Sequence, residues 1–472
     1  MLLQLIALYL LISVALGLYA SLKVNSTEDY VSAGRSLPMI VVIAMVFATW
    51  FGAETVLGIP ATFMSEDLGG LISDPFGTTL CLVFFGLFLA RPLYRMHLLT
   101  IGDYYRKRFN RPIEVAVSLA IAASYLGWVS AQVVALGLVL SVLTEGAVSM
   151  QNGILLGTFI VTLYTLFGGM WSVALTTSFQ MVVIVLGLLW IGWLVSEQTG
   201  GIAPVIEQAQ AAQKFNFWPE LEWAAVITFV AGLLTMALGS MPQQDIFQRA
   251  NTARNENIAV WGTVIGGLVY FVFAAVPIFL AYSANLIDPA MTATLLEKDP
   301  QEILPSLILN HLPLYAQVIF YGALLSVIMS TASGTMLAPS VTISENIIKG
   351  MLPDGYFSDR QFLWLTRAVV AFFAVLVALY ALYSTGQSTS IHHMVENAYK
   401  VTMVMALAPL LFGIYWKKTS SFGVGLGLIM GVGSWLVCEI FWADEPLPPH
   451  FAGFLVATVC LIGGSLYRPT RA

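Results

Sequence analysis

Charged residues are scarce in this sequence. Asp, Glu, Lys and Arg together make up 10% of its 472 residues, whereas 58% of the residues are hydrophobic. A soluble domain carries roughly 25% charged residues. The shortage of charge therefore excludes a soluble protein. It predicts a chain that crosses a lipid bilayer many times and has no nucleic-acid partner.

Cysteines and catalytic motifs are scarce as well. Cys81, Cys438 and Cys460 all lie inside apolar runs, so they suggest neither a disulfide framework nor a cysteine metal motif. The pair His392–His393 lacks a set of partner ligands, and no serine lies in a nucleophile motif. We therefore expect no enzymatic activity.

Long apolar runs are abundant instead. They predict an all-α polytopic membrane protein with thirteen spans, since about 20 apolar residues cross a bilayer. The first run has no basic residues before it and no cleavage site after it, so we expect it to be retained. The predicted spans are Leu2–Ala20, Pro38–Met64, Pro75–Met96, Ile113–Leu143, Asn152–Phe167, Thr176–Val195, Trp223–Met241, Ile258–Ala284, Pro313–Ser340, Phe362–Tyr383, Ile391–Trp416, Phe422–Trp442 and Phe451–Leu466.

The basic residues predict the orientation of these spans. Lys and Arg follow the third, seventh, ninth and eleventh spans, whereas only Lys214 and Lys298 lie in loops of the opposite side. Cytoplasmic loops are enriched in Lys and Arg. We therefore expect the N-terminus outside, the C-terminus inside, and a location in the cell's inner (plasma) membrane.

The second span has a polar middle. Its central residues run from Phe47 to Thr55 and include Gly52 and Glu54. A charge at the centre of a spanning helix costs roughly 2.5–3.5 kcal/mol on insertion scales. A helix that opens around residues 48–52 would present bare carbonyls to a small cavity, as transporters do. The alternative is an unbroken helix with Glu54 buried against a partner.

The span count also predicts an inverted repeat. Spans two to six and seven to eleven each contain five helices, so the second set enters the membrane from the opposite side. The first span of the second set is interrupted by glycines between Gly232 and Pro242, and paired broken segments point to a midplane site. The whole chain would be one transporter domain, divided into an extra N-terminal span at 2–21, repeats at 38–195 and 222–416, and two C-terminal spans at 419–467.

Four short segments carry a resemblance to a known family. They are Asp29–Leu37 (DYVSAGRSL), Gly168–Val173 with Thr176 and Gln180, Gln248–Arg249, and Gly413–Thr419 (GIYWKKT). In this order and spacing, the chain resembles the sodium:solute symporter family, whose members include proline, sugar, sialic acid and vitamin transporters. The resemblance implies a five-plus-five inverted-repeat fold of the leucine-transporter type and sodium-driven uptake by alternating access.

The resemblance also implies a sodium site between the second and ninth spans. Carried over by position, its ligands would be the carbonyls of Ala48, Phe51 and Val327 and the hydroxyls of Ser330 and Thr331. Ser330 and Thr331 do lie among small residues in an apolar run, and sodium prefers oxygen ligands. The alternative is that both hydroxyls bond to carbonyls of their own helix.

One residue departs from the family pattern. The family's threonine is usually followed by an acid that contributes to a second sodium site in some members, whereas here Thr176 is followed by Thr177. We therefore predict one sodium per cycle and leave open whether a second cation or a proton is coupled.

The substrate site is expected beside the two broken spans, in line with the family. In the eleventh span His392, Glu396 and Lys400 recur every four residues and so share a helix face. This face would line an outer vestibule, with His392 at its gate. Lys400 would reach Glu54, or pair with Glu396 in a purely structural ion pair. The candidate substrate-binding residues are Trp50, Glu54, Thr55, Trp128, Gln132, Met236, Ser240, Gln243, Glu396 and Lys400.

The sequence favours a symporter of a small organic solute. An amino acid or similar zwitterion or organic ion fits the polar pocket best, and a sugar or sialic acid is the alternative. A proton-coupled carrier is a further variant, because Glu54, Glu396 and His392 can titrate. A solute sensor is disfavoured because the chain ends at Ala472, just past its last span. We expect a monomer or weak oligomer.

Overall fold

The computed structural model describes residues 2–20, 22, 24, 26–353, 355–386, 390–442 and 447–469. Ala472 lies outside the described residues. Within the described ranges the chain is almost wholly helical, and one isolated β-bridge joins Leu37 to Ala253. The predicted all-α polytopic fold is confirmed.

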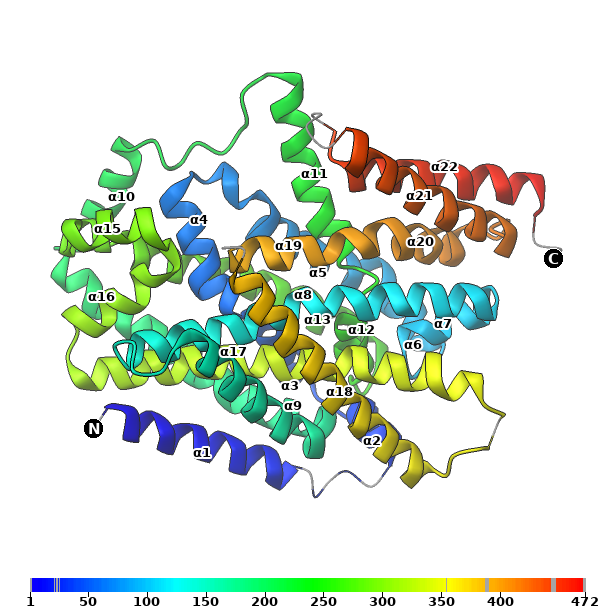
Figure 1. Cartoon of the computed structure of the whole chain (residues 1–472), viewed down its shortest axis with the longest axis horizontal. Coiled ribbons are helices and arrows are strands. Elements are labelled where there is room, and N and C mark those ends of the chain that lie inside the picture. The colour runs from blue at the N-terminus through cyan, green and yellow to red at the C-terminus, as the bar shows by residue number, and fades with distance from the viewer. Residues whose placement is uncertain are drawn as a thin grey trace.

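The helices follow one another with short connections (Figure 1). The first half of the chain forms α1 (Leu2–Ala20), α2 (Thr27–Ser32), α3 (Met39–Trp50), α4 (Ile59–Ser65), α5 (Thr78–Phe84), α6 (Arg91–Arg95), α7 (Ile101–Arg108), α8 (Arg111–Leu143), α9 (Met150–Gln198) and α10 (Ile202–Ala211). The second half forms α11 (Trp223–Gly239), α12 (Gln244–Asn251), α13 (Glu256–Tyr282), α14 (Ala284–Ile287), α15 (Pro289–Lys298), α16 (Ile303–His311), α17 (Leu314–Thr342), α18 (Asp359–Thr385), α19 (Ile391–Thr402), α20 (Ala408–Tyr415), α21 (Ser421–Phe441) and α22 (Pro449–Tyr467).

Short 3-10 or π-helical turns join or extend several of these helices. They are η2 (Ala33–Arg35), η3 (Glu54–Gly58), η4 (Gly69–Leu71), η5 (Ile72–Gly77), η6 (Phe85–Ala90), η7 (Pro300–Glu302), η8 (Ile343–Ile348), η9 (Lys349–Met351) and η10 (Met403–Leu407). Long helices begin at capping side chains, which satisfy backbone donors of the first turn. Asn110, Ser149, Asn255 and Ser390 accept such bonds at the starts of α8, α9, α13 and α19.

Ten helices among the described residues are long and apolar enough to cross a membrane, or up to twelve if each of two bent pairs is one span. The bent pairs are Met39–Trp50 with Glu54–Ser65, at 56°, and Trp223–Gly239 with Gln244–Asn251, at 45°. A shorter apolar helix, Met150–Leu163, overlaps the predicted span Asn152–Phe167. The count of thirteen, the repeat boundaries and the orientation stay predictions.

Helix α9 changes direction at Gly169, where the sequence predicted two separate spans. Gly169 has φ +50° and ψ −146°, outside the helical region. A Cβ at this position would lie 2.4 Å from the Tyr30 ring. The second glycine of the Gly168–Gly169 pair therefore allows both a backbone turn and a close approach of α2.

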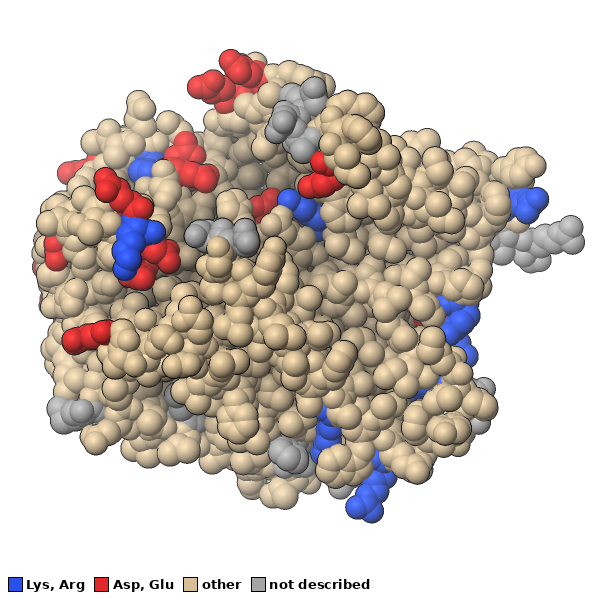
Figure 2. Space-filling view, viewed as in Figure 1, with Lys and Arg blue, Asp and Glu red and all other residues tan. Residues whose placement is uncertain are grey.

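Helices α8, α9 and α18 pack against α17, while α1 and the α21–α22 pair lie at the edge of the bundle (Figure 1). Charge is distributed unevenly over this shape. Figure 2 shows Asp and Glu gathered at the end that carries α10, α15 and α16, and Lys and Arg mainly toward the opposite end. We call these the acidic and basic ends of the molecule.

Candidate functional site

The first bent span opens between α3 and η3. The N–H of Gly52 donates to the carbonyl of Trp50 at 2.9 Å, and not to Ala48 as a continuing α-helix requires. The next amide, on Ala53, donates to the side chain of Gln132 at 3.0 Å. The break lies at residues 51–53, so it overlaps the C-terminal edge of the predicted opening at 48–52 and extends one residue beyond it. It leaves the carbonyl of Ala48 without its helical partner.

The freed carbonyl of Ala48 faces α17. The hydroxyl of Thr331 donates to it at 3.1 Å, and the hydroxyls of Ser330 and Thr177 lie 2.7 Å apart. Both α17 hydroxyls thus contact neighbouring helices, in contrast to the alternative in which they bond to their own helix. Val327 lies one turn earlier on the same helix and is fully buried.

Glycine at position 52 is required by this junction. A Cβ there would lie 3.1 Å from the Thr331 hydroxyl and 3.1 Å from the Gln132 side-chain oxygen. Gly52 therefore lets α3, α8 and α17 approach one another closely. The structure brings Ala48, Ser330 and Thr331 of the predicted sodium site together at the break, with Thr177 standing where the family has an acid.

Beside the break lies a cluster of aromatic rings. The Trp50 ring stacks on Tyr399 with centroids 5.9 Å apart and is tilted against Trp128 at 5.2 Å. Trp128 also stacks on Tyr125 at 5.9 Å. Trp50 is 6% exposed and Tyr399 is fully buried. The hydroxyl of Tyr399 has no hydrogen-bond partner among the described residues. We call Trp50, Tyr125, Trp128 and Tyr399 the aromatic cluster.

The second bent span breaks after Gly239, at the C-terminal end of the predicted Gly232–Pro242 segment, and α11 runs unbroken through Gly232. Gln243 follows the break, and its amide donates to Ser124 at 2.9 Å and to Thr402 at 3.4 Å. Ser240 donates to the carbonyl of Met236. These three predicted substrate-binding residues are thus buried beside α8, α11 and α19.

Glu54 has a different partner from the one predicted. Its carboxyl oxygen Oε1 lies 2.9 Å from Nδ1 of His392. Among the described residues, Lys400 forms no ion pair with Glu54 or Glu396. Glu396 instead lies 3.7 Å from the His393 ring. His392 reaches Glu54 because Gly58, one turn beyond Glu54, lets the α19 backbone approach: a Cβ there would lie 3.3 Å from the His392 amide.

Two buried groups that the sequence reading missed continue this network. Tyr270 on α13 donates to Asp74 at 2.5 Å, and its hydroxyl lies 3.2 Å from that of Thr55. Asp74 precedes Pro75, so the sequence placed it in a loop before the third span. The signal that could have located it is a carboxylate bordered by apolar residues on both sides, at Ile72 and Phe76.

A vestibule of about 1000 Å3 leads toward these groups from the acidic end. Ser73, His392 and Glu396 line it, together with residues of α11. Lys400 does not line it, although it is half-buried on the same helix as Glu396. Two members of the predicted His392–Glu396–Lys400 face therefore border this cavity.

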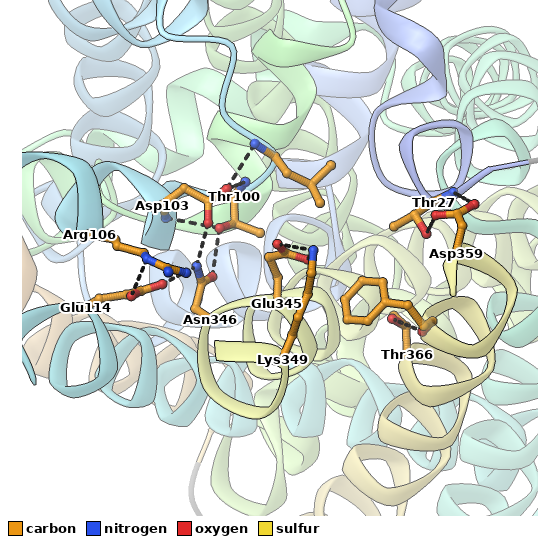
Figure 3. A network of polar contacts seen from close by, with 12 residues as sticks. Thr27, Thr100, Asp103, Arg106, Glu114, Glu345, Asn346, Lys349, Asp359 and Thr366 are labelled. Carbon is orange, nitrogen blue, oxygen red and sulfur yellow. Dashed lines mark hydrogen bonds and ion pairs between the residues drawn. The ribbon is translucent and has the colours of Figure 1, made fainter. Parts of the chain in front are cut away.

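The opposite, basic end is held by polar contacts that the sequence reading did not anticipate. Asn346 bonds to Thr100, Asp103 and Glu114 at 2.7, 2.8 and 3.0 Å (Figure 3). Glu114 also lies 2.7 Å from Arg111.

Two further contacts link neighbouring elements. The Thr27 hydroxyl lies 2.5 Å from Asp359, joining α2 to α18. Nearer the aromatic cluster, the buried Arg249 on α12 donates to Thr49 on α3 at 3.0 Å. Contacts at this end therefore join elements of both predicted repeats, while the vestibule opens at the other end.

Solved structures of similar fold include a sodium-coupled symporter. A structure described as the substrate-bound outward-open state of a Na+-coupled sialic acid symporter matches with a TM-score of 0.85 at 18% identity, covering 100% of this chain and 98% of that one. The structure of MhsT in complex with L-phenylalanine matches with a TM-score of 0.56 at 13% identity, over 91% of this chain and 97% of that one. The predicted five-plus-five inverted-repeat fold of the leucine-transporter type is confirmed.

Curated relatives are also transporters. The high-affinity choline transporter 1 of Drosophila melanogaster is 24% identical over 88% of this chain and 66% of its own length, slightly under two thirds. The Haemophilus influenzae sodium/proline symporter is 26% identical over 97% of this chain and 93% of its own. The model of the sodium:solute symporter family matches residues 30–431. The chain is a multi-pass membrane protein that belongs to the sodium:solute symporter family.

Proposed function

We propose that this protein is a sodium-coupled symporter of a small organic solute that carries an ammonium group, such as an amino acid or a related organic cation. One sodium ion moves with each solute. The binding site opens alternately toward the acidic end and toward the basic end of the molecule. The observation that carries the proposal is the break between α3 and η3, which directs the carbonyl of Ala48 at the hydroxyl of Thr331.

The sodium site would lie at this contact. Sodium is a hard cation and takes oxygen ligands, and the carbonyls of Ala48, Phe51 and Val327 with the hydroxyls of Ser330 and Thr331 would supply them. The ion would hold α3 against α17. A ligand shifts a conformational equilibrium only by its different affinity for the two states. Sodium therefore acts by favouring the state in which these two helices meet.

The solute would sit on the aromatic cluster. Trp and Tyr ring faces attract a cation through their quadrupole, with contributions of about 0.5–2 kcal/mol. Trp50, Trp128 and Tyr399 come from three elements beside the break and are within stacking distance of one another. Gln132 and Gln243 would provide polar contacts, and the buried amide nitrogen of Gln132 has no hydrogen-bond partner among the described residues. Relatives named as choline and proline carriers support an ammonium solute.

One sodium suffices for useful uptake. One charge crossing 100 mV contributes about 2.3 kcal/mol, and a tenfold sodium gradient contributes about 1.4 kcal/mol. Together these terms could accumulate a neutral solute on the order of several hundredfold. A zwitterion would be accumulated to this extent.

A thermal-shift screen on the purified protein tests the proposal. Choline, glycine betaine, proline, other amino acids, sialic acid and glucose are each added in sodium and again in potassium. We expect an ammonium solute to raise the Tm in sodium only, and the Ser330→Ala/Thr331→Ala variant to lose this response. A response to glucose or sialic acid alone would overturn the solute class. Stabilisation that ignores both sodium and the double substitution would overturn the sodium coupling.

A further inference from the structure

Three titratable side chains are buried together between the aromatic cluster and the vestibule. Glu54 on η3 is 4% exposed, Asp74 on η5 is 2% exposed and His392 on α19 is 3% exposed. We call them the buried triad. Neither the sodium site nor the aromatic cluster requires two carboxyl groups at this depth.

The hydrogen bonds of the triad are short and well defined. His392 contacts Glu54 at 2.9 Å through Nδ1 and the hydroxyl of Ser73 at 3.2 Å through Nε2. Tyr270 donates to Asp74 at 2.5 Å. Each ring nitrogen of His392 therefore has an oxygen partner, and one oxygen of each carboxyl group is occupied.

The charge of the triad does not balance without one more proton. With both carboxyl groups ionised and His392 protonated, the triad carries a net charge of −1. Burying an uncompensated charge is unfavourable by several kcal/mol in protein interiors, so such groups neutralise or pair. Uptake of one proton by either carboxyl group brings the triad to neutrality.

No other side chain nearby supplies the missing positive charge. From α13 the triad faces Tyr270, which is already a donor to Asp74. From α19 it faces Glu396, which adds negative charge and pairs with His393 at 3.7 Å, and the half-buried Lys400. In the described part of the chain, neither Lys nor Arg forms an ion pair with Glu54 or Asp74.

The triad has a route to water. Ser73 and His392 both line the vestibule of about 1000 Å3. The vestibule therefore gives a proton a path to Glu54 through the Ser73 hydroxyl and the His392 ring. A metal ion fits this place less well, because Glu54 and His392 already bond to each other and Asp74 to Tyr270. The described residues also hold no cluster of three or more His, Cys, Asp or Glu suited to a metal.

We propose that the buried triad of Glu54, Asp74 and His392 is a proton-binding site, loaded from the vestibule while the basic end is closed. The step transfers one proton from a hydronium ion in the vestibule, which becomes water, to a carboxylate of the triad: one O–H bond breaks, one forms, and the charge of the triad changes from −1 to 0. The proton is then a second cation beside sodium, in a chain whose Thr177 supplies no charge at the sodium site. If it is carried across, each proton multiplies accumulation by about 40-fold per 100 mV.

Infrared difference spectra of the full chain reconstituted in lipid test this site without any solute. The pH is stepped from acid to alkaline at constant sodium, and the band of protonated carboxyl groups is followed. We expect a band equivalent to one buried proton per chain that is lost at alkaline pH, is absent in Glu54→Gln or Asp74→Asn, and persists in the control Glu396→Gln. A wild-type spectrum without such a band, or a band that both triad variants retain, would overturn the proposal.

Sodium controls separate this site from the proposed sodium site. The Glu54→Gln and Asp74→Asn variants should keep the sodium-dependent rise in Tm, and Ser330→Ala/Thr331→Ala should keep the carboxyl band. If raising the sodium concentration at fixed pH abolishes the band, the cation at the triad is sodium and the proton site is refuted. Should the triad variants not fold, the pH and sodium responses of the wild-type band still decide between these outcomes.

Discussion

Replacing Thr331 by Val tests the proposed sodium site with little change in shape. Valine keeps the volume of threonine but removes the hydroxyl that lies 3.1 Å from the Ala48 carbonyl. The site would lose one of five proposed oxygen ligands, and the carbonyl would lose its partner in the sodium-free state. A hydrogen bond to a charged group contributes about 1.5–3 kcal/mol. A similar loss of sodium binding equals roughly a 10- to 150-fold weaker affinity.

The chain offers a matched control one turn further along α17. Thr335 is fully buried like Thr331, but its hydroxyl donates to the carbonyl of Thr331 within its own helix at 2.7 Å. Titrating sodium while the Tm of the purified protein is followed gives the affinity of each variant. We expect Thr331→Val to shift the sodium midpoint and Thr335→Val to leave it within about twofold of wild type, because a backbone-bonded hydroxyl is not a ligand. Equal midpoints for both variants would refute the reasoning.

Three further outcomes are expected. Trp128→Leu should weaken the stabilisation by an ammonium solute in sodium by roughly 2- to 30-fold, whereas Trp261→Leu, at a ring that is 50% exposed on α13, should not. An unchanged midpoint for Trp128→Leu would remove this ring from the solute site. Gly169→Ala should destabilise the protein by about 2 kcal/mol or more, since φ is +50° there and the Cβ would meet a buried ring; a Tm equal to wild type would contradict this. A backbone amide of α15 and the side chain of His311 lower the pKa of Asp288, so this loop is stabilised above the ordinary carboxyl pKa and loses that stabilisation as the pH falls through the lowered value. The Tm of Asp288→Asn should therefore depend less on acid pH than that of wild type, and parallel acid profiles would count against it.

The sequence was sufficient to predict the fold, but it did not predict which side chains contact one another at the site. Apolar runs indicated the helices, and glycines within two of these runs indicated both broken spans. Bilayer thickness and the need to hydrogen-bond every backbone group in lipid constrain these features strongly. The break between α3 and η3 involves Gln132, whose side-chain oxygen accepts a hydrogen bond from the amide of Ala53. A contact between residues so distant in sequence leaves no local pattern.

The region around Glu54 shows the same limit. The four-residue spacing of His392 and Glu396 correctly placed both beside one cavity, since spacing determines a helix face. It did not determine which member meets Glu54, because Lys400 and His392 lie on that face at different depths. Asp74 was missed for a related reason: a carboxylate next to proline reads as a loop until its buried partner Tyr270 is known.

The contacts of Asn346 join three elements at the basic end. The side-chain oxygen of Asn346 accepts a hydrogen bond from Thr100. Its NH2 group donates to Asp103 and to Glu114, so both of its hydrogens are used. These three bonds link η8 to α7 and α8, so moving either helix away from η8 breaks at least one bond of Asn346. An aspartate could not replace this asparagine. Its ionised carboxylate has no hydrogen to donate and would face the carboxylates of Asp103 and Glu114. A single neutral side chain thus links three elements at the basic end.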